Sequence, residues 1–405
     1  MTYDFDEIVD RSHTNAFNKS GFRRYIFHAG PDKKFPYDDD EFIRMWVADM
    51  EFAVAPEIRQ AMKDWIDKKI FGYTYMHEPG YLNAFRAWCR DRYDWTFDPE
   101  HVAWSAGIVA AIYQIVEDLV RPDEKVLTLA PSYGPFFGAA KYNHVGFVTS
   151  DLKKEDGCFE IDFRDLEEKA SDPAVKLLLL CNPHNPTGRI WMPDELECVA
   201  DIVEETGIWV VSDEIHCDLV RTGLLHTPLG KVMPDYDRLI TCMSASKTFN
   251  IAGLLFSNVI IRDDAEREQF RKRDKTQGNL NPISIAAHQA AYEKGGEWLA
   301  QLKEYLDGNF RFTKEFLDAN FPETDFHVPE ATYLAWVDMS RVLPDVENLS
   351  LFFANNAGVL LEYGNNNFVA NAEGYIRLNL AMPRAMLAEG LERMKKAILA
   401  HRAGR

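Results

Sequence analysis

Four groups of polar residues in this sequence are of types that do chemistry on small molecules. Lys247 supplies an amine, which can attack a carbonyl carbon or move a proton. Asp213 supplies a carboxylate, and Asn185 supplies an amide. Ser105-Ala-Gly107 precedes a helical pattern, and a helix N-terminus binds phosphate through its free N–H groups. Together these groups predict a pocket for a small, anionic, aromatic cofactor.

Each motif has another interpretation when it is taken alone. Ser244-x-x-Lys247 matches a β-lactamase nucleophile pattern, but the companion Ser-Asp-Asn and Lys-Thr-Gly motifs are missing from the sequence. Asp213-Glu-Ile-His216 matches a helicase box, yet the sequence has no Gly-rich phosphate loop of the matching type. The Asn-Pro and Thr-Gly pairs around Asn185 are ordinary turn residues. Their occurrence at successive strand ends favours the cofactor site.

The elements that must position these groups form an alternating pattern. The apolar, strand-like runs are His101–Ser105, Val126–Ala130, Val145–Thr149, Leu177–Cys181, Trp209–Ser212, Leu239–Met243 and Asn258–Ile261. The helical patterns between them are Ile108–Leu119, Pro135–Lys141, Phe163–Lys169 and Pro193–Glu205. This alternation predicts an α/β domain whose mostly parallel sheet is covered by helices, and such sheets bind ligands at the carboxyl ends of their strands.

The two ends of the chain differ from this middle part. Pro56–Ile70 has helical spacing, whereas the first 45 residues are polar and lack a period, and we expect the acidic run Asp38–Glu41 to be a solvated loop. After about residue 290 the pattern changes to long helices with a few strands, which predicts a smaller α+β domain. We therefore expect an N-terminal arm over 1–50 that packs with the small domain, a large cofactor domain over 51–290 and the small domain over 291–405.

Composition excludes several classes of function. The 405 residues carry a net charge of −19, which argues against binding to nucleic acid or anionic lipid. Aromatic residues make up 13% of the chain, too many for a disordered protein. No apolar run is long enough to cross a membrane, and no Cys-x-x-Cys motif marks a metal or redox site. We expect a cytoplasmic protein with no metal and a small-molecule substrate.

The motifs resemble those of a known family. Asn185-Pro-Thr-Gly, Ser212-Asp-Glu and the segment Ser244–Leu254 are similar to the fold-type-I pyridoxal-phosphate enzymes, the class I and II aminotransferases. More narrowly, the chain resembles the MalY/PatB-type cystathionine β-lyases. The segments that carry this narrower resemblance are Trp46–Met50, Phe71–Tyr75, Thr332–Trp336 and Tyr375–Asn379.

The resemblance implies pyridoxal 5'-phosphate as cofactor and assigns residues to its ring. Lys247 would join the cofactor aldehyde and later move the Cα proton of the substrate. Asp213 would face the ring nitrogen, and Asn185 would bond the ring oxygen. His216 would bond the same oxygen or pack beneath the ring, with a core histidine as the alternative, and Tyr133 would stack on the ring.

The resemblance also implies how the phosphate is held. The N–H groups of Gly107, Ile108 and Val109 would bind it together with the hydroxyls of Ser244 and Ser246. Many aminotransferases have an arginine eight residues after the lysine, but this chain has Leu255 there. Tyr73 from a neighbouring subunit would donate to the phosphate instead, which implies a homodimer with shared active sites.

Substrate recognition follows from the same resemblance. Arg377 would clamp the α-carboxylate, with help from Asn185 and from the N–H of Ala48, and a structural salt bridge is the competing interpretation of Arg377. Leu361-Glu-Tyr-Gly364 stands where a Pro-Gly pair is common, so the side-chain pocket differs from that pattern. Three aromatic residues, Tyr75, Tyr333 and Tyr363, would accommodate an apolar sulfur substituent, with core packing as the alternative for each.

The leading hypothesis is a C–S β-lyase that converts L-cystathionine or related cysteine S-conjugates to pyruvate, ammonia and a thiol. The second is an aminotransferase that uses the same residues to pass an amino group to a 2-oxo acid. The third is a cofactor-binding regulatory protein that acts through protein contacts. Products formed without an added keto acid discriminate the first hypothesis from the second.

Overall fold

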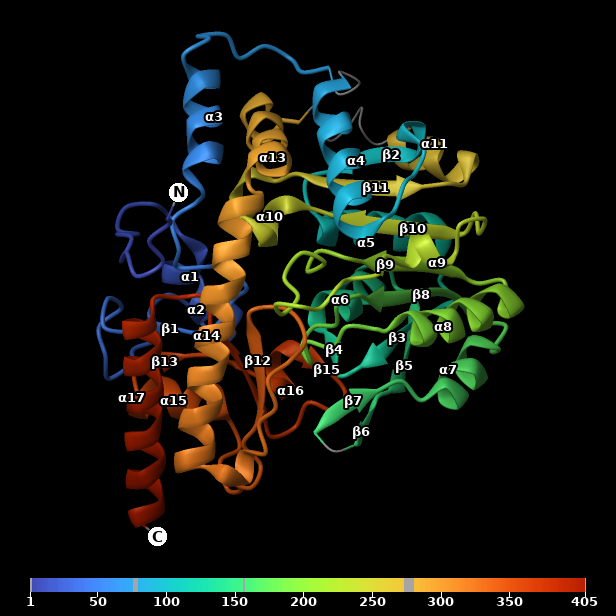
Figure 1. Cartoon of the computed structure of the whole chain (residues 1–405). Coiled ribbons are helices and arrows are strands. Elements are labelled where there is room, and N and C mark those ends of the chain that lie inside the picture. Colours follow the sequence, from blue (N-terminus) through green and yellow to red (C-terminus); the bar gives the residue numbers. More distant parts are fainter. Residues whose placement is uncertain (1, 76–78, 156, 273–279, 405) are drawn as a thin grey trace.

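The computed structural model describes residues 2–75, 79–155, 157–272 and 280–404. Its centre is a seven-stranded sheet, which runs from top to bottom on the right of Figure 1. In spatial order the strands are β2 (Val102–Ser105), β11 (Ser257–Ile261), β10 (Leu239–Met243), β9 (Trp209–Asp213), β8 (Val175–Cys181), β3 (Lys125–Ala130) and β5 (Gly146–Asp151). β11 pairs antiparallel with β10 and β2, and the other strand pairs of this sheet are parallel. All seven predicted strands are confirmed, and so is the mostly parallel α/β sheet.

Alternate side chains of each strand point to opposite faces of the sheet, and both faces are buried. In β8, Leu177 and Leu179 belong to one apolar cluster, whereas Leu178 and Leu180 belong to another. The first cluster includes α5 (Ile108–Leu119) and α6 (Gly134–Tyr142), and the second includes α7 (Phe163–Ala170) and α8 (Pro193–Thr206). A continuous apolar strand is what a sheet covered on both faces requires.

Beyond the sheet the chain builds a second group of elements, on the left of Figure 1. A three-stranded antiparallel sheet packs there with three helices around a common apolar cluster. The strands are β12 (Leu334–Asp338), β16 (Tyr375–Asn379) and β14 (Glu362–Tyr363), and the helices are α14 (Gly296–Asn320), α15 (Leu349–Asn356) and α17 (Arg384–Ala403). The long helices and the few strands predicted after about residue 290 are found in this part of the chain.

The N-terminal segment is more structured than its weak periodicity predicts. It forms α1 (Phe17–Ser20), α2 (Phe22–Tyr25) and β1 (Ile43–Arg44). Strand β1 pairs in parallel with β13 (Val359–Leu360), and Phe22 and Trp46 pack with Leu360. The acidic run is a loop, as predicted, but both carboxylate oxygens of its Asp39 accept bonds from the Arg23 guanidinium.

One predicted helix ends early. Helix α3 covers Pro56–Ile66 and packs against α13 (Pro282–Lys294), whereas the pattern predicted a helix to residue 70. The residues that follow carry large apolar side chains in the open. Ile70 is 75% exposed, Phe71 is 56% exposed and Tyr73 is 98% exposed. The isolated chain therefore leaves an apolar segment uncovered.

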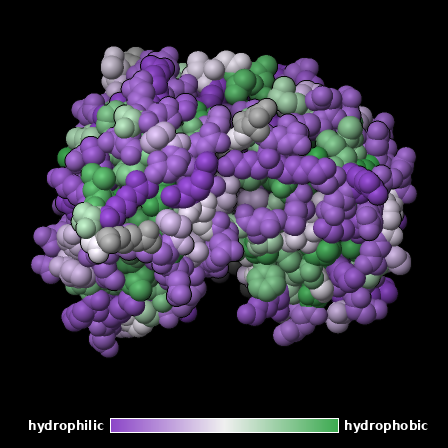
Figure 2. All heavy atoms as spheres, turned by 90° about the horizontal axis from the view of Figure 1, so that it is seen from below, coloured by the Kyte–Doolittle hydropathy of each residue, from purple (hydrophilic) through white to green (hydrophobic). Residues whose placement is uncertain are grey.

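The outer surface is mainly polar. Figure 2 shows hydrophilic residues over most of one face, with apolar patches between them and a hollow between two lobes. Within the described residues, no helix has the length and apolar character to cross a membrane. The six cysteines carry free thiols, four of them buried.

Candidate active site

Most of the predicted site residues line one cavity of about 220 Å³ at the carboxyl ends of the central strands. Strands β8, β9 and β10 each end at this cavity, and α5 begins there. Eleven of the predicted residues are on its wall: Ala48, Gly107, Ile108, Val109, Tyr133, Asn185, Asp213, His216, Ser246, Lys247 and Arg377. The sheet thus brings together groups that lie more than 300 residues apart in sequence.

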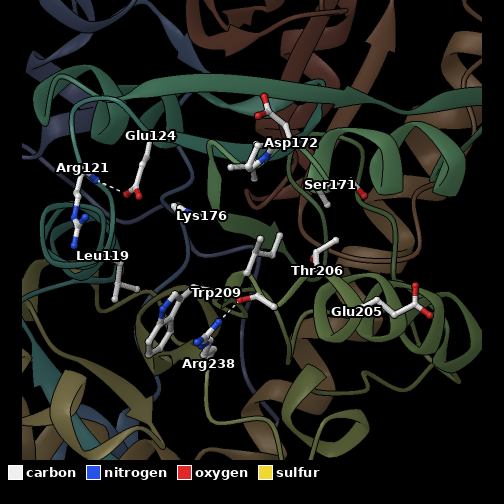
Figure 3. Close-up of a pocket in the computed structure, with 15 residues that line it drawn as sticks. Leu119, Arg121, Glu124, Ser171, Asp172, Lys176, Glu205, Thr206, Trp209 and Arg238 are labelled. Atoms are coloured by element: carbon white, nitrogen blue, oxygen red, sulfur yellow. Dashed lines mark hydrogen bonds between the residues drawn. The ribbon is translucent and has the colours of Figure 1, made fainter.

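A larger depression, of about 660 Å³, lies at the opposite ends of three of the same strands. Figure 3 shows its lining, which includes Arg121, Trp209 and Arg238. The Arg238 guanidinium donates to the carbonyl of Gly207, and the N–H of Arg121 donates to the Glu124 carboxylate at 2.9 Å. None of the predicted groups lies there, so the chemistry belongs to the carboxyl edge.

Lys247 is partly buried on α10 (Ala245–Thr248), the short helix that follows β10. Its Nζ donates to the carbonyl oxygen of Ala48 at 2.6 Å. Burial lowers the pKa of Lys247 below the usual value of a lysine, and the charge of Arg377 adds to this, although Asp49 opposes it. A lower pKa increases the fraction of free amine near neutral pH, which is the form that acts as nucleophile or base.

The next residue along the chain fixes this lysine in place. The Thr248 hydroxyl donates to Asp218 Oδ2 at 2.9 Å, and Asp218 Oδ1 accepts from Trp88 Nε1 at 3.0 Å and from the Tyr93 hydroxyl. All of these groups are buried. A fully hydrogen-bonded buried network holds the backbone beneath Lys247 in a single position.

Asp213 ends β9 and is 4% exposed. Its Oδ1 accepts from the N–H of Ile215 at 3.2 Å, and within the described residues it has no salt-bridge partner. Burial raises the pKa of Asp213 to about 7, the backbone N–H of Ile215 lowers it, and the charge of Glu214 raises it further. A buried carboxylate of this kind suits a cationic ring, so the donor set fits pyridoxal phosphate.

His216 and Tyr133 lie on the same cavity. Burial lowers the pKa of His216 to about 3, and the charges of Lys247 and Arg377 lower it further, so the ring is neutral. Its Nδ1 is buried and has no partner among the described residues, and its ring meets Tyr333 edge-on at 6.3 Å. Tyr133 is held by β4 (Ser132–Tyr133), which pairs with β15 (Phe368–Val369). An orphaned ring nitrogen is a free group for the predicted cofactor.

The predicted phosphate cradle is the start of α5. Gly107 is its N-cap and has extended backbone, and a Cβ there would meet nothing within 4 Å. Ser246 lines the cavity, but Ser244 does not: its hydroxyl donates to the carbonyl of Phe256 at 2.7 Å and accepts from the N–H of Ser246. The role of Ser244 as a phosphate ligand stays a prediction. Leu255, at the position where many aminotransferases have an arginine, also lines the cavity.

Arg377 is on β16, in the smaller sheet, and is 3% exposed. Its Nη1 donates to Asn185 Oδ1 at 2.9 Å, and its Nη2 pairs with the carboxylate of Glu362. Arg377 thus lines the cavity and also forms a buried salt bridge, and its role as the clamp of the substrate carboxylate stays a prediction. At Ala48 the hydrogen bond in the structure involves the carbonyl oxygen, which accepts from Lys247 Nζ, and not the N–H that was predicted to bind the substrate.

Sequence reasoning missed two residues of the site. Tyr25, from α2, lines the cavity, although nothing in the polar N-terminal segment marked it. Glu362 faces Arg377. The one feature of the sequence that could have indicated this residue is the segment Leu361–Gly364, which stands where a Pro-Gly pair is common. The aromatic residues Tyr333 and Tyr363 are buried but are not on this cavity wall, and Tyr73 and Tyr75 are exposed. The roles of these tyrosines stay predictions.

Comparison with known proteins agrees with this geometry. The family described as aminotransferase class I and II matches residues 41–394. The chain is 39% identical to "Cystathionine beta-lyase PatB" of Bacillus subtilis, over 87% of this chain and 92% of that protein. It is 30% identical to "Protein MalY" of Escherichia coli, over 99% of this chain and 100% of that one. The crystal structure of the PLP-bound C-S lyase from Staphylococcus hominis matches with a TM-score of 0.93 and 44% identity, over 98% of this chain and 99% of that chain.

Proposed function

This chain belongs to the class I and II aminotransferase family, with PatB and MalY among its relatives, and on that premise we propose that it is a pyridoxal-phosphate-dependent C–S β-lyase. Its substrate would be L-cystathionine or a related S-substituted L-cysteine. Water and the substrate would give pyruvate, ammonia and a thiol. The observation that carries this proposal is the single cavity where the amine of Lys247, the buried carboxylate of Asp213 and the guanidinium of Arg377 meet.

Each group has a defined task in the proposed reaction. Pyridoxal phosphate, when bound, supplies an electron sink that makes the Cα proton of an amino acid removable. Asp213 would hold the ring, and the N–H groups at the start of α5 with the Ser246 hydroxyl would hold the phosphate. Arg377 and Asn185 would orient the substrate by its α-carboxylate. Lys247 would remove the Cα proton, because its Nζ is in the cavity and its lowered pKa favours the free amine.

Elimination follows from where the electron pair goes after that proton is lost. A thiolate on Cβ is a good leaving group, so removal of the Cα proton by Lys247 would lead to cleavage of the Cβ–S bond, with the thiolate taking the electron pair of that bond and pyridoxal phosphate supplying the electron sink.

The proposal includes a homodimer, with Tyr73 of each subunit reaching the phosphate of the other. The exposed segment that contains Ile70, Phe71 and Tyr73 supports it, because monomers seldom leave such a contiguous set of apolar residues in water. It also includes the division into an arm over 1–50, a large domain over 51–290 and a small domain over 291–405. The six free thiols support a reducing compartment, and we propose the cytoplasm.

The test is a pair of assays on the holoenzyme. S-substituted cysteines without a keto acid should give pyruvate and thiol in equal amounts, and Lys247→Ala should give neither. The control is a set of ordinary amino acids with 2-oxoglutarate. Rapid glutamate formation, with no pyruvate from the sulfur substrates, would make the protein an aminotransferase instead.

A further inference from the structure

Glu362 and Arg377 are fixed as neighbours by the small sheet. They are directly opposite each other in the antiparallel pair β14–β16. Residues in this position have Cβ atoms about 5 Å apart, so the pair is set by strand register and not by a chance rotamer. Glu362 is 1% exposed and Arg377 is 3% exposed, and their charged groups form a salt bridge.

This neighbour occupies part of the group that should bind the substrate. A guanidinium binds a carboxylate best through two parallel N–H groups. In Arg377, Nη1 donates to Asn185 and Nη2 to Glu362, while Nε is buried with no partner among the described residues. The chain thus places its own carboxylate where an incoming carboxylate has to bind.

We propose that Glu362 is a resident competitor for Arg377, which exchanges the Glu362 carboxylate for the α-carboxylate of the amino-acid substrate. The inference deepens the proposed function, because it assumes that Arg377 binds that carboxylate. Two carboxylates on one buried guanidinium repel each other, so the substrate has to displace Glu362 from Nη2. Glu362 therefore lowers the affinity of the site for every amino acid, and it favours ligands whose carboxylate can reach both Nη groups.

A second partner is in place to hold the displaced carboxylate. Tyr25 lines the cavity, and its phenol lies within electrostatic range of the Glu362 carboxylate. Burial raises the pKa of Tyr25, and the charge of Glu362 contributes to the rise, so the phenol keeps its proton and remains a donor. Glu362 can leave Arg377 without becoming an unpaired buried charge, whose cost would otherwise oppose the exchange.

The test measures binding rather than turnover. The probe is α-methyl-S-benzyl-L-cysteine, which has no Cα proton and cannot eliminate. Its partner ligand is the matching amine with a methyl group in place of the carboxylate, which has no Cα proton either. Calorimetric titration of the holoenzyme gives the dissociation constant of each ligand. Glu362→Gln should bind the amino acid about tenfold more tightly, which is ~1.4 kcal/mol, and should leave the amine unchanged. Unchanged or weaker binding of the amino acid overturns the proposal.

Two further variants support the measurement. Tyr25→Phe should weaken binding of the amino acid but not of the amine, and this loss should vanish in the Glu362→Gln background. An equal loss for both ligands, or the same loss in both backgrounds, contradicts the exchange. If thermal melting shows that Glu362→Gln does not fold, the two ligands on Tyr25→Phe still decide. The control is Glu373→Gln, an exposed glutamate before β16, which should change nothing.

Failure of this inference is separate from failure of the proposed function. If the protein forms pyruvate but Glu362→Gln leaves ligand binding unchanged, only the exchange is refuted. A protein whose binding follows the predicted pattern, but which transaminates, retains the exchange and refutes the lyase.

Discussion

Asp213→Asn should make the cofactor-free protein more stable at mildly basic pH, although it removes a predicted cofactor ligand. Burial raises the pKa of Asp213 from 3.8 to about 7, so folding opposes ionisation of this carboxyl group. The folded pKa of an acid is raised, so the penalty begins above the unfolded pKa, grows as pH rises and is complete above about pH 7. At ~1.4 kcal/mol per pKa unit the full penalty is up to about 4 kcal/mol.

The amide avoids this penalty but adds two N–H donors to a buried site, which cost about 1–3 kcal/mol if they find no partner. The quantity to measure is therefore the difference in free energy of unfolding between variant and wild type, and how this difference changes with pH, rather than its value at one pH. Between about pH 5 and pH 8 the variant should gain roughly 3 kcal/mol in free energy of unfolding relative to wild type. Urea denaturation of both cofactor-free proteins, followed by tryptophan fluorescence, measures it.

A matched control is Asp218→Asn. Asp218 is also buried, but its oxygens accept bonds from Trp88, Tyr93 and Thr248, so an amide there turns N–H groups towards donors. That variant should lose stability, by about 1–3 kcal/mol. A constant offset between wild type and Asp213→Asn from pH 5 to pH 8 would refute the reasoning. In the loaded protein a cationic ring would cancel the penalty, so the cofactor should stabilise wild type more than the variant.

Two other predictions test the cradle and the assembly. Ser246→Ala should weaken pyridoxal-phosphate affinity by roughly fivefold, the worth of one hydrogen bond. Ser244→Ala should mainly lower the free energy of unfolding by about 1 kcal/mol, because it removes the cap of α10 and the bond to Phe256. Equal effects of both variants on affinity would show that Ser244 also binds the phosphate. When Tyr73→Phe and Lys247→Ala subunits are mixed, the heterodimers should have activity that neither variant has alone, because one site of each heterodimer would have both residues intact. If heterodimers verified by mass show no activity, a shared site is excluded.

Local sequence was sufficient to predict the large sheet and most of the polar residues that line its cavity. The strands are short, apolar on both faces and separated by helices, so each is recognisable from its own residues. Asp213 ends β9, and Lys247 is on the short helix that follows β10, the adjacent parallel strand. Parallel strands bring their carboxyl ends to one edge of the sheet. Chemistry placed at strand ends can therefore be assembled from order alone.

The sequence predicted the N-terminal segment less well. Its short helices are too brief to show a period, and they are stable because Phe22 and Trp46 pack against Leu360 from the other end of the chain. The position of Tyr25 in the cavity depends on that packing. The exposed segment after α3 is a different case, because its apolar residues Ile70 and Phe71 are not buried by other described residues of the chain.

The sequence by itself determined which side chains could hold a cofactor, because residue type and position after a strand are local properties. It left Arg377 with two interpretations, a substrate clamp or a structural salt bridge. The tertiary structure decided that Arg377 is in the cavity and is paired with Glu362 at the same time. That pairing depends on the register of β14 against β16, which many distant contacts of the small sheet set together and no local pattern encodes.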